Sequence, residues 1–241
     1  MFGKRKVATL VAEFLGTGLL TLLVLNVQRS TIGVPFFVAI AAGLALAVSC
    51  YLFSNKDGGG FNPAITLAWW TARQVETLQA VMLIAMQFLG AWGAYMLYTY
   101  YVSSTLQPVG GKFVATTLVA EAVGTFILTL AMTAVMVRRQ NATSAAAFSG
   151  LGLTVGIIAA SPAAIGLLNP AVALGTRAWV LGTYVLGPVI GALLAVHLYM
   201  LLLAGNDTEA KVSVASASTK APAKKAPAKK KTVAKKKSTR K

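Results

Sequence analysis

The chain has 241 residues, of which 56% are hydrophobic and 12% are charged, and its formal net charge is +16. Soluble domains typically contain about 25% charged residues, so this composition excludes an ordinary soluble domain. Twelve Lys and Arg residues and two acidic residues follow residue 205, which leaves ten basic and four acidic residues, a net charge of +6, on the rest of the chain. The positive charge is therefore mainly a property of the C-terminal tail.

Six apolar segments are long enough to cross a bilayer, which takes about 20 residues of helix. They cover about 7–27, 34–54, 77–102, 113–137, 145–161 and 180–204. Three basic residues precede the first segment, as in a signal peptide. However, the segment is long enough to span and no small-residue cleavage site follows it. We therefore expect a retained first helix.

Two shorter segments, about 62–72 and 169–179, each begin with the tripeptide Asn-Pro-Ala. They are too short to span a bilayer and fit re-entrant half-helices, which are tolerated where they line a water-filled cavity. Asn is a favoured helix cap and Pro suits the first helical position. We expect Asn62 and Asn169 to cap their own half-helices, which leaves each side-chain amide as a donor at the midplane. The irregular stretches 55–61 and 162–168 are expected to offer backbone carbonyl acceptors.

The chain contains an internal repeat. The sequence Leu-Val-Ala-Glu-Phe-Leu-Gly-Thr at 10–17 is matched by Leu-Val-Ala-Glu-Ala-Val-Gly-Thr at 118–125, an offset of 108, and the two Asn-Pro-Ala sites are offset by 107. Each half has three spans, an odd number, so the second half must be inverted relative to the first. The prediction is an all-α membrane protein with six transmembrane helices and two re-entrant half-helices, in inverted repeats of about 7–102 and 113–204.

The tail, 206–241, is low in complexity and rich in Lys, Ala and Pro, so we expect it to be disordered and to follow a channel domain of residues 1–205. The positive-inside rule places both termini in the cytoplasm. The seven basic residues of the inner side are Lys4, Arg5, Lys6, Lys56, Arg73, Arg138 and Arg139. The three of the outer side are Arg29, Lys112 and Arg177. The tail fits an anionic lipid surface, a nucleic acid or a merely solvated extension.

Residues 7–204 resemble the aquaporin and glycerol-facilitator family, the major intrinsic proteins. The most specific elements are Gly-Gly-Phe-Asn62-Pro63-Ala64, Leu-Asn169-Pro170-Ala171 and the Ala-Glu-x-x-Gly-Thr element of each half. The resemblance implies passive passage of water or small neutral solutes through a homotetramer in the cell membrane, with one pore per subunit. It also implies that the glutamates of the repeated element brace the re-entrant loops. These glutamates are Glu13 and Glu121.

An enzyme is not expected. The sequence contains no catalytic Ser/His/Asp or Cys/His set and no nucleotide-binding loop. With one histidine, His197, and one cysteine, Cys50, it offers no metal cluster, and neither a metal nor a cofactor is expected. We expect packing or interface roles for His197 and a packed core thiol at Cys50. The alternative to a channel is a channel-like membrane anchor whose basic tail tethers anionic lipid or nucleic acid.

The sequence departs from the family pattern at the outer constriction. The family usually has an arginine directly after the second Asn-Pro-Ala, where this chain has Val172. By family spacing the other filter positions are Ala42, Ile157 and Gly166, and water-selective members have an aromatic residue and a histidine at the first two. This filter is uncharged and apolar, so it either admits solutes such as glycerol, urea and hydrogen peroxide or dewets and hinders water. Arg177 lies about 140° from Val172 around a helix axis, so it is expected to face the outer vestibule or a neighbouring carbonyl instead.

Overall fold

The computed structural model describes residues 4–53, 59–109 and 111–204. These residues belong to the first of two units into which the chain divides, Met1–Gly205. The basic tail, the loop residue Lys56 and the carbonyls expected before residue 59 lie outside the described residues. The prediction of a disordered tail therefore stays a prediction.

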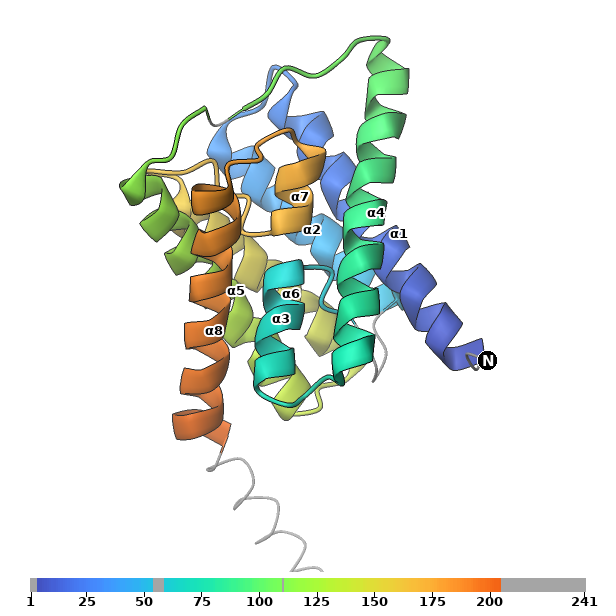
Figure 1. Ribbon diagram of the computed structural model, residues 1–241, viewed down its shortest axis with the longest axis vertical. Helices are drawn as coiled ribbons and strands as arrows, with labels where there is room; N and C mark the ends of the chain where they lie inside the picture. Colours follow the sequence, from blue (N-terminus) through green and yellow to red (C-terminus); the bar gives the residue numbers. More distant parts are fainter. Residues whose placement is uncertain (1–3, 54–58, 110, 205–241) are drawn as a thin grey trace, which may run out of the picture. The chain divides into compact units, whose positions relative to one another are not determined.

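The described residues form helices joined by turns and loops (Figure 1). The helical elements are α1 (Lys4–Gln28), α2 (Pro35–Phe53), α3 (Pro63–Thr71), α4 (Thr77–Val102), α5 (Ala115–Val137), α6 (Ala142–Ala160), α7 (Pro170–Gly175), η1 (Leu181–Val185), α8 (Leu186–Leu198) and η2 (Tyr199–Leu203). Six helices are long and apolar enough to cross a membrane, and the sixth runs continuously over Leu181–Leu203. The predicted six spans are thus confirmed, with ends that differ by a few residues.

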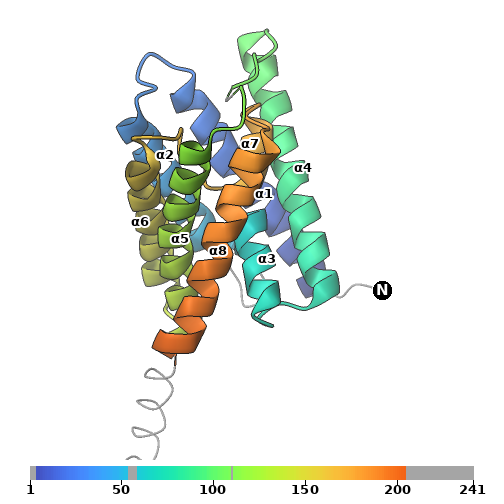
Figure 2. The same ribbon diagram turned by 60° about the vertical axis from the view of Figure 1, so that its left-hand side comes forward.

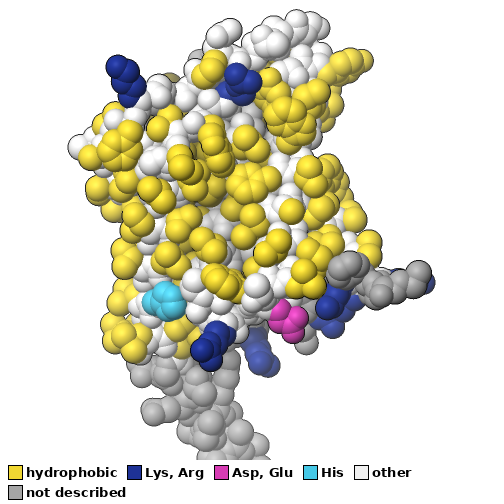
Figure 3. All heavy atoms as spheres, in the orientation of Figure 1, with side chains coloured by type: hydrophobic (Ala, Val, Ile, Leu, Met, Phe, Trp, Pro, Cys, Tyr) yellow, Lys and Arg dark blue, Asp and Glu magenta, His cyan; other side chains and the backbone are white. Residues whose placement is uncertain are grey.

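Hydrophobic side chains cover the middle of the visible face, and Lys and Arg lie at its two ends (Figure 3). Many large apolar side chains are exposed on these helices, including Leu44 at 63%, Leu78 at 64% and Leu194 at 60%. A soluble protein rarely exposes a continuous apolar surface of this kind. Exposure to lipid or to other membrane helices explains it, so the apolar band marks the height of the bilayer.

The sixth span begins with a π-helical turn, η1, because of a proline inside the helix. Pro188 has no backbone N–H and cannot bond the carbonyl four residues earlier, that of Tyr184. The residues that precede the proline in the chain, Leu181–Val185, form a π-helical turn, which is wider than an α-helical turn. The span then continues as an α-helix, so the proline shifts its helical phase without breaking it.

The two halves pack in the same way, through glycines at the helix crossings. A Cβ at Gly90 of α4 would collide with the carbonyl oxygen of Phe14 on α1. A Cβ at Gly191 of α8 would collide with that of Ala122 on α5. Between the halves, α2 crosses α6 where Gly43 faces a backbone carbonyl in the same manner. Small residues in membrane helices permit such close approach of two backbones. The contacts of the two halves are equivalent, as the inverted repeat predicts.

The half-helices α3 and α7 lie inside the bundle, one beyond the other, in both views (Figures 1 and 2). Each ends in the same hydrogen-bonded turn, with an arginine in the left-handed region: Arg73 at φ 58° after α3 and Arg177 at φ 65° after α7. After α7, Ala178 N–H bonds the Ala173 carbonyl and Arg177 N–H bonds that of Leu174, a Schellman motif. The expected end of α7 near 179 is wrong, because this turn ends the helix at Gly175.

Candidate functional site

The two asparagines of the Asn-Pro-Ala repeats cap the half-helices that they begin. The side-chain oxygen of Asn62 accepts the N–H of Ala64 at 3.0 Å. That of Asn169 accepts the N–H of Ala171 at 2.9 Å, with Val172 N–H at 3.4 Å. Both asparagines have extended backbones and are followed by Pro at the first helical position. The side-chain oxygens are therefore used locally, which fixes where the amide groups point.

The amide groups bond across the midplane to the opposite repeat. Asn62 Nδ2 donates to the carbonyl of Leu168 at 2.8 Å, and Asn169 Nδ2 donates to that of Phe61 at 2.8 Å. Both amides are thus donors at the midplane and both carbonyls are acceptors, but one hydrogen of each amide is used by the opposite loop. Each NH₂ group has two hydrogens, so this reciprocal pair uses one and leaves one.

The residues that supply these carbonyls lie in the left-handed region, Phe61 at φ 47° and Leu168 at φ 53°. Their side chains are held against glycines of the repeated element. A Cβ at Gly16 would collide with the ring of Phe61, and one at Gly124 would lie 2.6 Å from a methyl carbon of Leu168. The Gly of the Ala-Glu-x-x-Gly-Thr element is therefore required by the close approach of a large side chain.

Glu13 is fully buried and accepts hydrogen bonds from the loop that leads to α3. Its carboxylate oxygens accept the N–H of Gly59 at 2.5 Å, of Gly60 at 3.1 Å and of Phe61 at 2.9 Å. Gln87 of α4 donates to the same carboxylate at 2.8 Å. Four donors around one carboxylate satisfy a charge that is costly inside a membrane protein.

Glu121 accepts hydrogen bonds from the second loop in the equivalent way. It is fully buried and accepts the N–H of Leu167 at 3.0 Å and of Leu168 at 2.7 Å. Gln87, which also donates to Thr66 Oγ1 at 2.9 Å, was not selected from the sequence. The sequence did contain a signal for this residue, because a polar side chain lies in the middle of the third apolar segment. Polar residues inside a membrane are usually functional.

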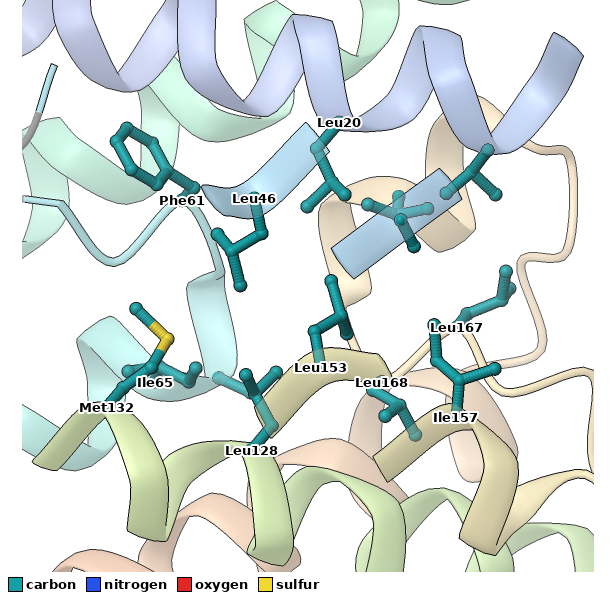
Figure 4. Close-up of a cluster of buried hydrophobic side chains, with 14 of the residues drawn as sticks. Leu20, Leu46, Phe61, Ile65, Leu128, Met132, Leu153, Ile157, Leu167 and Leu168 are labelled. Carbon is teal, nitrogen blue, oxygen red and sulfur yellow. The ribbon is translucent and has the colours of Figure 1, made fainter. Parts of the chain in front are cut away.

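A narrow cavity, with about 10 Å³ of space for the centre of a water molecule, lies between the two loops and the helices α1, α2, α5 and α6. All four candidate filter residues, Ala42, Ile157, Gly166 and Val172, line it, together with Asn62 and Asn169. The walls between them are apolar. Figure 4 shows Leu20 and Leu46 of α1 and α2 facing Leu128 and Leu153 of α5 and α6. No ionisable side chain of the described residues is among those that line it.

The candidate filter positions are buried within this cavity. Val172 is 1% exposed and Ile157 is 2% exposed. Gly166 lies at φ 69°, and a Cβ there would lie 2.9 Å from Cγ2 of Ile157. A side chain at position 166 would thus be strained and would also fill the space beside Ile157.

Two further polar residues of the sequence analysis lie away from the cavity. Arg177 is exposed, and its guanidinium lies 5.9 Å from the ring centroid of Tyr95. His197 is exposed on α8, with Nε2 3.1 Å from Thr71 Oγ1. Arg29, which sequence reasoning did not single out for the site, bonds instead at the end of α7, with Nη2 3.3 Å from the Thr176 carbonyl. In the described ranges no group of three or more His, Cys, Asp or Glu side chains could hold a metal ion.

Six spans in an inverted repeat, with two half-helices that meet at a buried cavity, define a membrane channel. A model of the family described as "Major intrinsic protein" matches residues 4–199, and the chain belongs to this family. Members of the family are channels and not enzymes, and they pass water or small solutes. The expected membership and the expected absence of enzymatic activity are therefore confirmed.

Three relatives illustrate the range of the family. The chain is 32% identical over 189 residues to "Aquaporin AqpM" of Methanothermobacter thermautotrophicus, covering 68% of this chain and 76% of the relative. It is 32% identical over 203 residues to "Glycerol uptake facilitator protein-like 6" of Lactiplantibacillus plantarum, covering 77% and 93%. The solved aquaglyceroporin of Plasmodium falciparum shares the fold, with a TM-score of 0.68 at 19% identity over 85% of this chain and 99% of that one.

Proposed function

We propose that this chain is a passive channel for small neutral solutes whose filter is uncharged and is formed by Ala42, Ile157, Gly166 and Val172. The observation that carries the proposal is that these four residues and both midplane asparagines line one cavity. The substrate class consists of glycerol, urea and hydrogen peroxide besides water.

The filter favours solutes larger than water because two of its four positions have almost no side chain. Because Ala42 and Gly166 are small, the side chains of Ile157 and Val172 set the width of the filter. Neither of these two side chains offers a hydrogen bond. Such walls offer no hydrogen bonds to a file of water molecules, whereas a polyol brings C–H groups that tolerate apolar contact. An arginine at position 172 would narrow the passage and add fixed donors, and this chain lacks it.

The asparagines are proposed as the donors that meet the solute at the midplane. Each keeps one Nδ2 hydrogen after its bond to the opposite loop, and both line the cavity. The N-terminal ends of α3 and α7 converge there, and their partial positive charges oppose cations. Glu13 and Glu121 are proposed as the braces that hold both loops, and thereby both donors, in place.

A stopped-flow permeability panel on purified protein in liposomes tests the proposal. Glycerol, urea, hydrogen peroxide and water are compared with protein-free liposomes, and a pH-sensitive dye reports proton leak. We expect glycerol and urea flux above the protein-free value. Rapid water flux with no glycerol or urea flux would contradict the wide, uncharged filter, and no flux of any solute would contradict the channel.

We further propose that both termini lie in the cytoplasm and that the chain forms a homotetramer in the cell membrane. Among the described basic residues, Lys4, Arg5 and Lys6 begin α1, and Arg73 follows α3. Their excess over the opposite end supports the orientation through the positive-inside rule. Labelling of a single cysteine introduced at Lys112 in intact cells tests the orientation, and light scattering of the detergent-solubilised protein tests the assembly.

A second candidate function, an anchor that binds anionic lipid, is favoured by the twelve basic residues after residue 205. Basic residues next to a span contribute about 1 kcal/mol each at an anionic surface. Deleting 206–241 is expected to leave solute flux per protein unchanged and to lower the affinity for anionic vesicles at low salt. Sedimentation with vesicles and with duplex DNA checks this, and a loss of flux on deletion would make the tail part of the channel.

A further inference from the structure

Arg29 joins three segments at the end of the bundle where α7 ends. It follows α1 directly, and its N–H bonds the carbonyl of Leu25 at 3.1 Å. Its Nη2 donates to the carbonyl of Gln107 in the α4–α5 loop at 3.0 Å and to that of Thr176, the C-cap of α7, at 3.3 Å. The side chain is half-buried, so the guanidinium is held in one place by backbone groups of two other segments.

These contacts place Arg29 close to the candidate filter. Thr176 is fully buried, and both its N–H and its hydroxyl donate to the carbonyl of Val172, at 2.8 and 2.9 Å. The guanidinium is bonded to the carbonyl of this same Thr176. One helical turn, about 5.4 Å, therefore separates the backbone of Val172 from the carbonyl that holds the positive charge.

Polar groups at this end are also left for water. The Nε–H of Arg29 and Oε1 of the adjacent Gln28 are buried without a hydrogen-bond partner in the described ranges. Gln28 lies four residues beyond Val24 and eight beyond Leu20, and both of these line the cavity. Residues four apart share a helix face, so Gln28 lies on the face of α1 that lines the cavity, one turn beyond Val24. We call the end of the bundle next to Gln28, Arg29 and Thr176 the α7 mouth.

The other two described cations at this end are placed differently. Arg177 is exposed and stacks over Tyr95, and Lys112 is exposed in the α4–α5 loop. Exposed charges are screened within about 8–10 Å at physiological ionic strength, whereas half-buried charges are screened much less. Arg29 is thus the cation whose field reaches the α7 mouth most strongly.

We propose that Arg29 supplies the fixed positive charge that position 172 lacks, and so rejects protons and metal cations at the α7 mouth while neutral solutes pass. The inference rests on the proposed function, because it concerns the selectivity of that same passage. It adds a side-chain charge to the partial positive charges at the N-terminal ends of α3 and α7. The proposed role of Arg29 depends on its charge. A merely structural role would depend only on its hydrogen bonds to the α4–α5 loop and to the end of α7.

The test compares proton and K⁺ leak with glycerol flux in the same proteoliposomes. Arg29→Gln is expected to raise the cation leak about tenfold, the size of effect that one charge within about 10 Å exerts at an effective dielectric constant near 20. Glycerol flux is expected to change less than about twofold, because a neutral solute does not sense the charge. Arg29→Lys keeps the charge and should leak like wild type, and Lys112→Gln removes an exposed charge at the same end as the matched control.

Arg29→Lys distinguishes charge from bridge, since it keeps the cation but replaces the guanidinium that bonds the carbonyls of Gln107 and Thr176. Its cation leak should stay at the wild-type value. The inference is overturned if Arg29→Gln does not leak more than wild type, or if Arg29→Lys leaks as much as Arg29→Gln. If Arg29→Gln does not fold, Arg29→Met is the second neutral variant. Wild-type liposomes without solute flux would instead overturn the proposed function itself, so the two failures are distinct.

Discussion

Glu13→Ala is expected to abolish solute flux and to lower the thermal stability of the protein more than any other single substitution in the candidate pore. The carboxylate accepts four hydrogen bonds, three from the loop before α3 and one from Gln87, at 2.5 to 3.1 Å. Alanine would leave these donors buried and unpaired. Each buried donor without a partner costs about 1–3 kcal/mol, so the combined loss is on the order of 4 kcal/mol or more.

The loss of flux follows from the position of the same loop. Phe61 supplies the carbonyl that holds the amide of Asn169, so a displaced loop also misplaces the donor of the opposite half. The measurement is thermal unfolding in detergent together with glycerol flux. Glu13→Gln keeps one acceptor oxygen and should lie between wild type and Glu13→Ala.

Glu76→Ala is the matched control, because Glu76 is exposed at the start of α4 and makes no side-chain cap bond there. It should change neither stability nor flux. Gln87→Leu removes one of the four donors and should cost about 1.5–3 kcal/mol, the usual value for a hydrogen bond to a charged group. Equal stability of Glu13→Ala and wild type would show that the carboxylate does not brace the loop.

The fold was predictable because its main signals are local. Membrane spans are apolar runs of a set length, and Asn followed by Pro begins a helix in any context. The offset of 108 between Glu13 and Glu121 then predicted the inverted repeat. These features need no knowledge of which residues meet in space, and the structure confirms the six spans and the half-helices.

The site was less predictable because its contacts are long-range. The bond from Asn62 to Leu168 joins residues 106 positions apart, and that from Arg29 to Thr176 joins residues 147 apart. No spacing rule links such partners. The end of α7 at Gly175 was missed for a different reason: the left-handed turn is made by Arg177 and not by the glycine or asparagine that usually signals it.

Val172→Arg is expected to reduce glycerol and urea flux about tenfold and to affect water flux less. Val172 is 1% exposed and lines a cavity without ionisable side chains in the described part of the chain. A guanidinium there takes up several times the volume of the lost methyl groups and requires hydrogen bonds, because a buried charge without partners is costly. It therefore extends into the cavity water and narrows the passage.

Stopped-flow rates for water, urea and glycerol measure this effect, and Val172→Leu is the matched control that adds bulk without charge. If width alone limits glycerol, both variants slow it. If the guanidinium donors also matter, the arginine variant keeps the water flux of wild type. The leucine variant, whose side chain is still apolar, does not raise the water flux. Unchanged permeability of Val172→Arg to every solute would contradict the assignment of position 172 to the filter. A fall in glycerol flux with water retained would show that the missing arginine sets which solutes this channel admits.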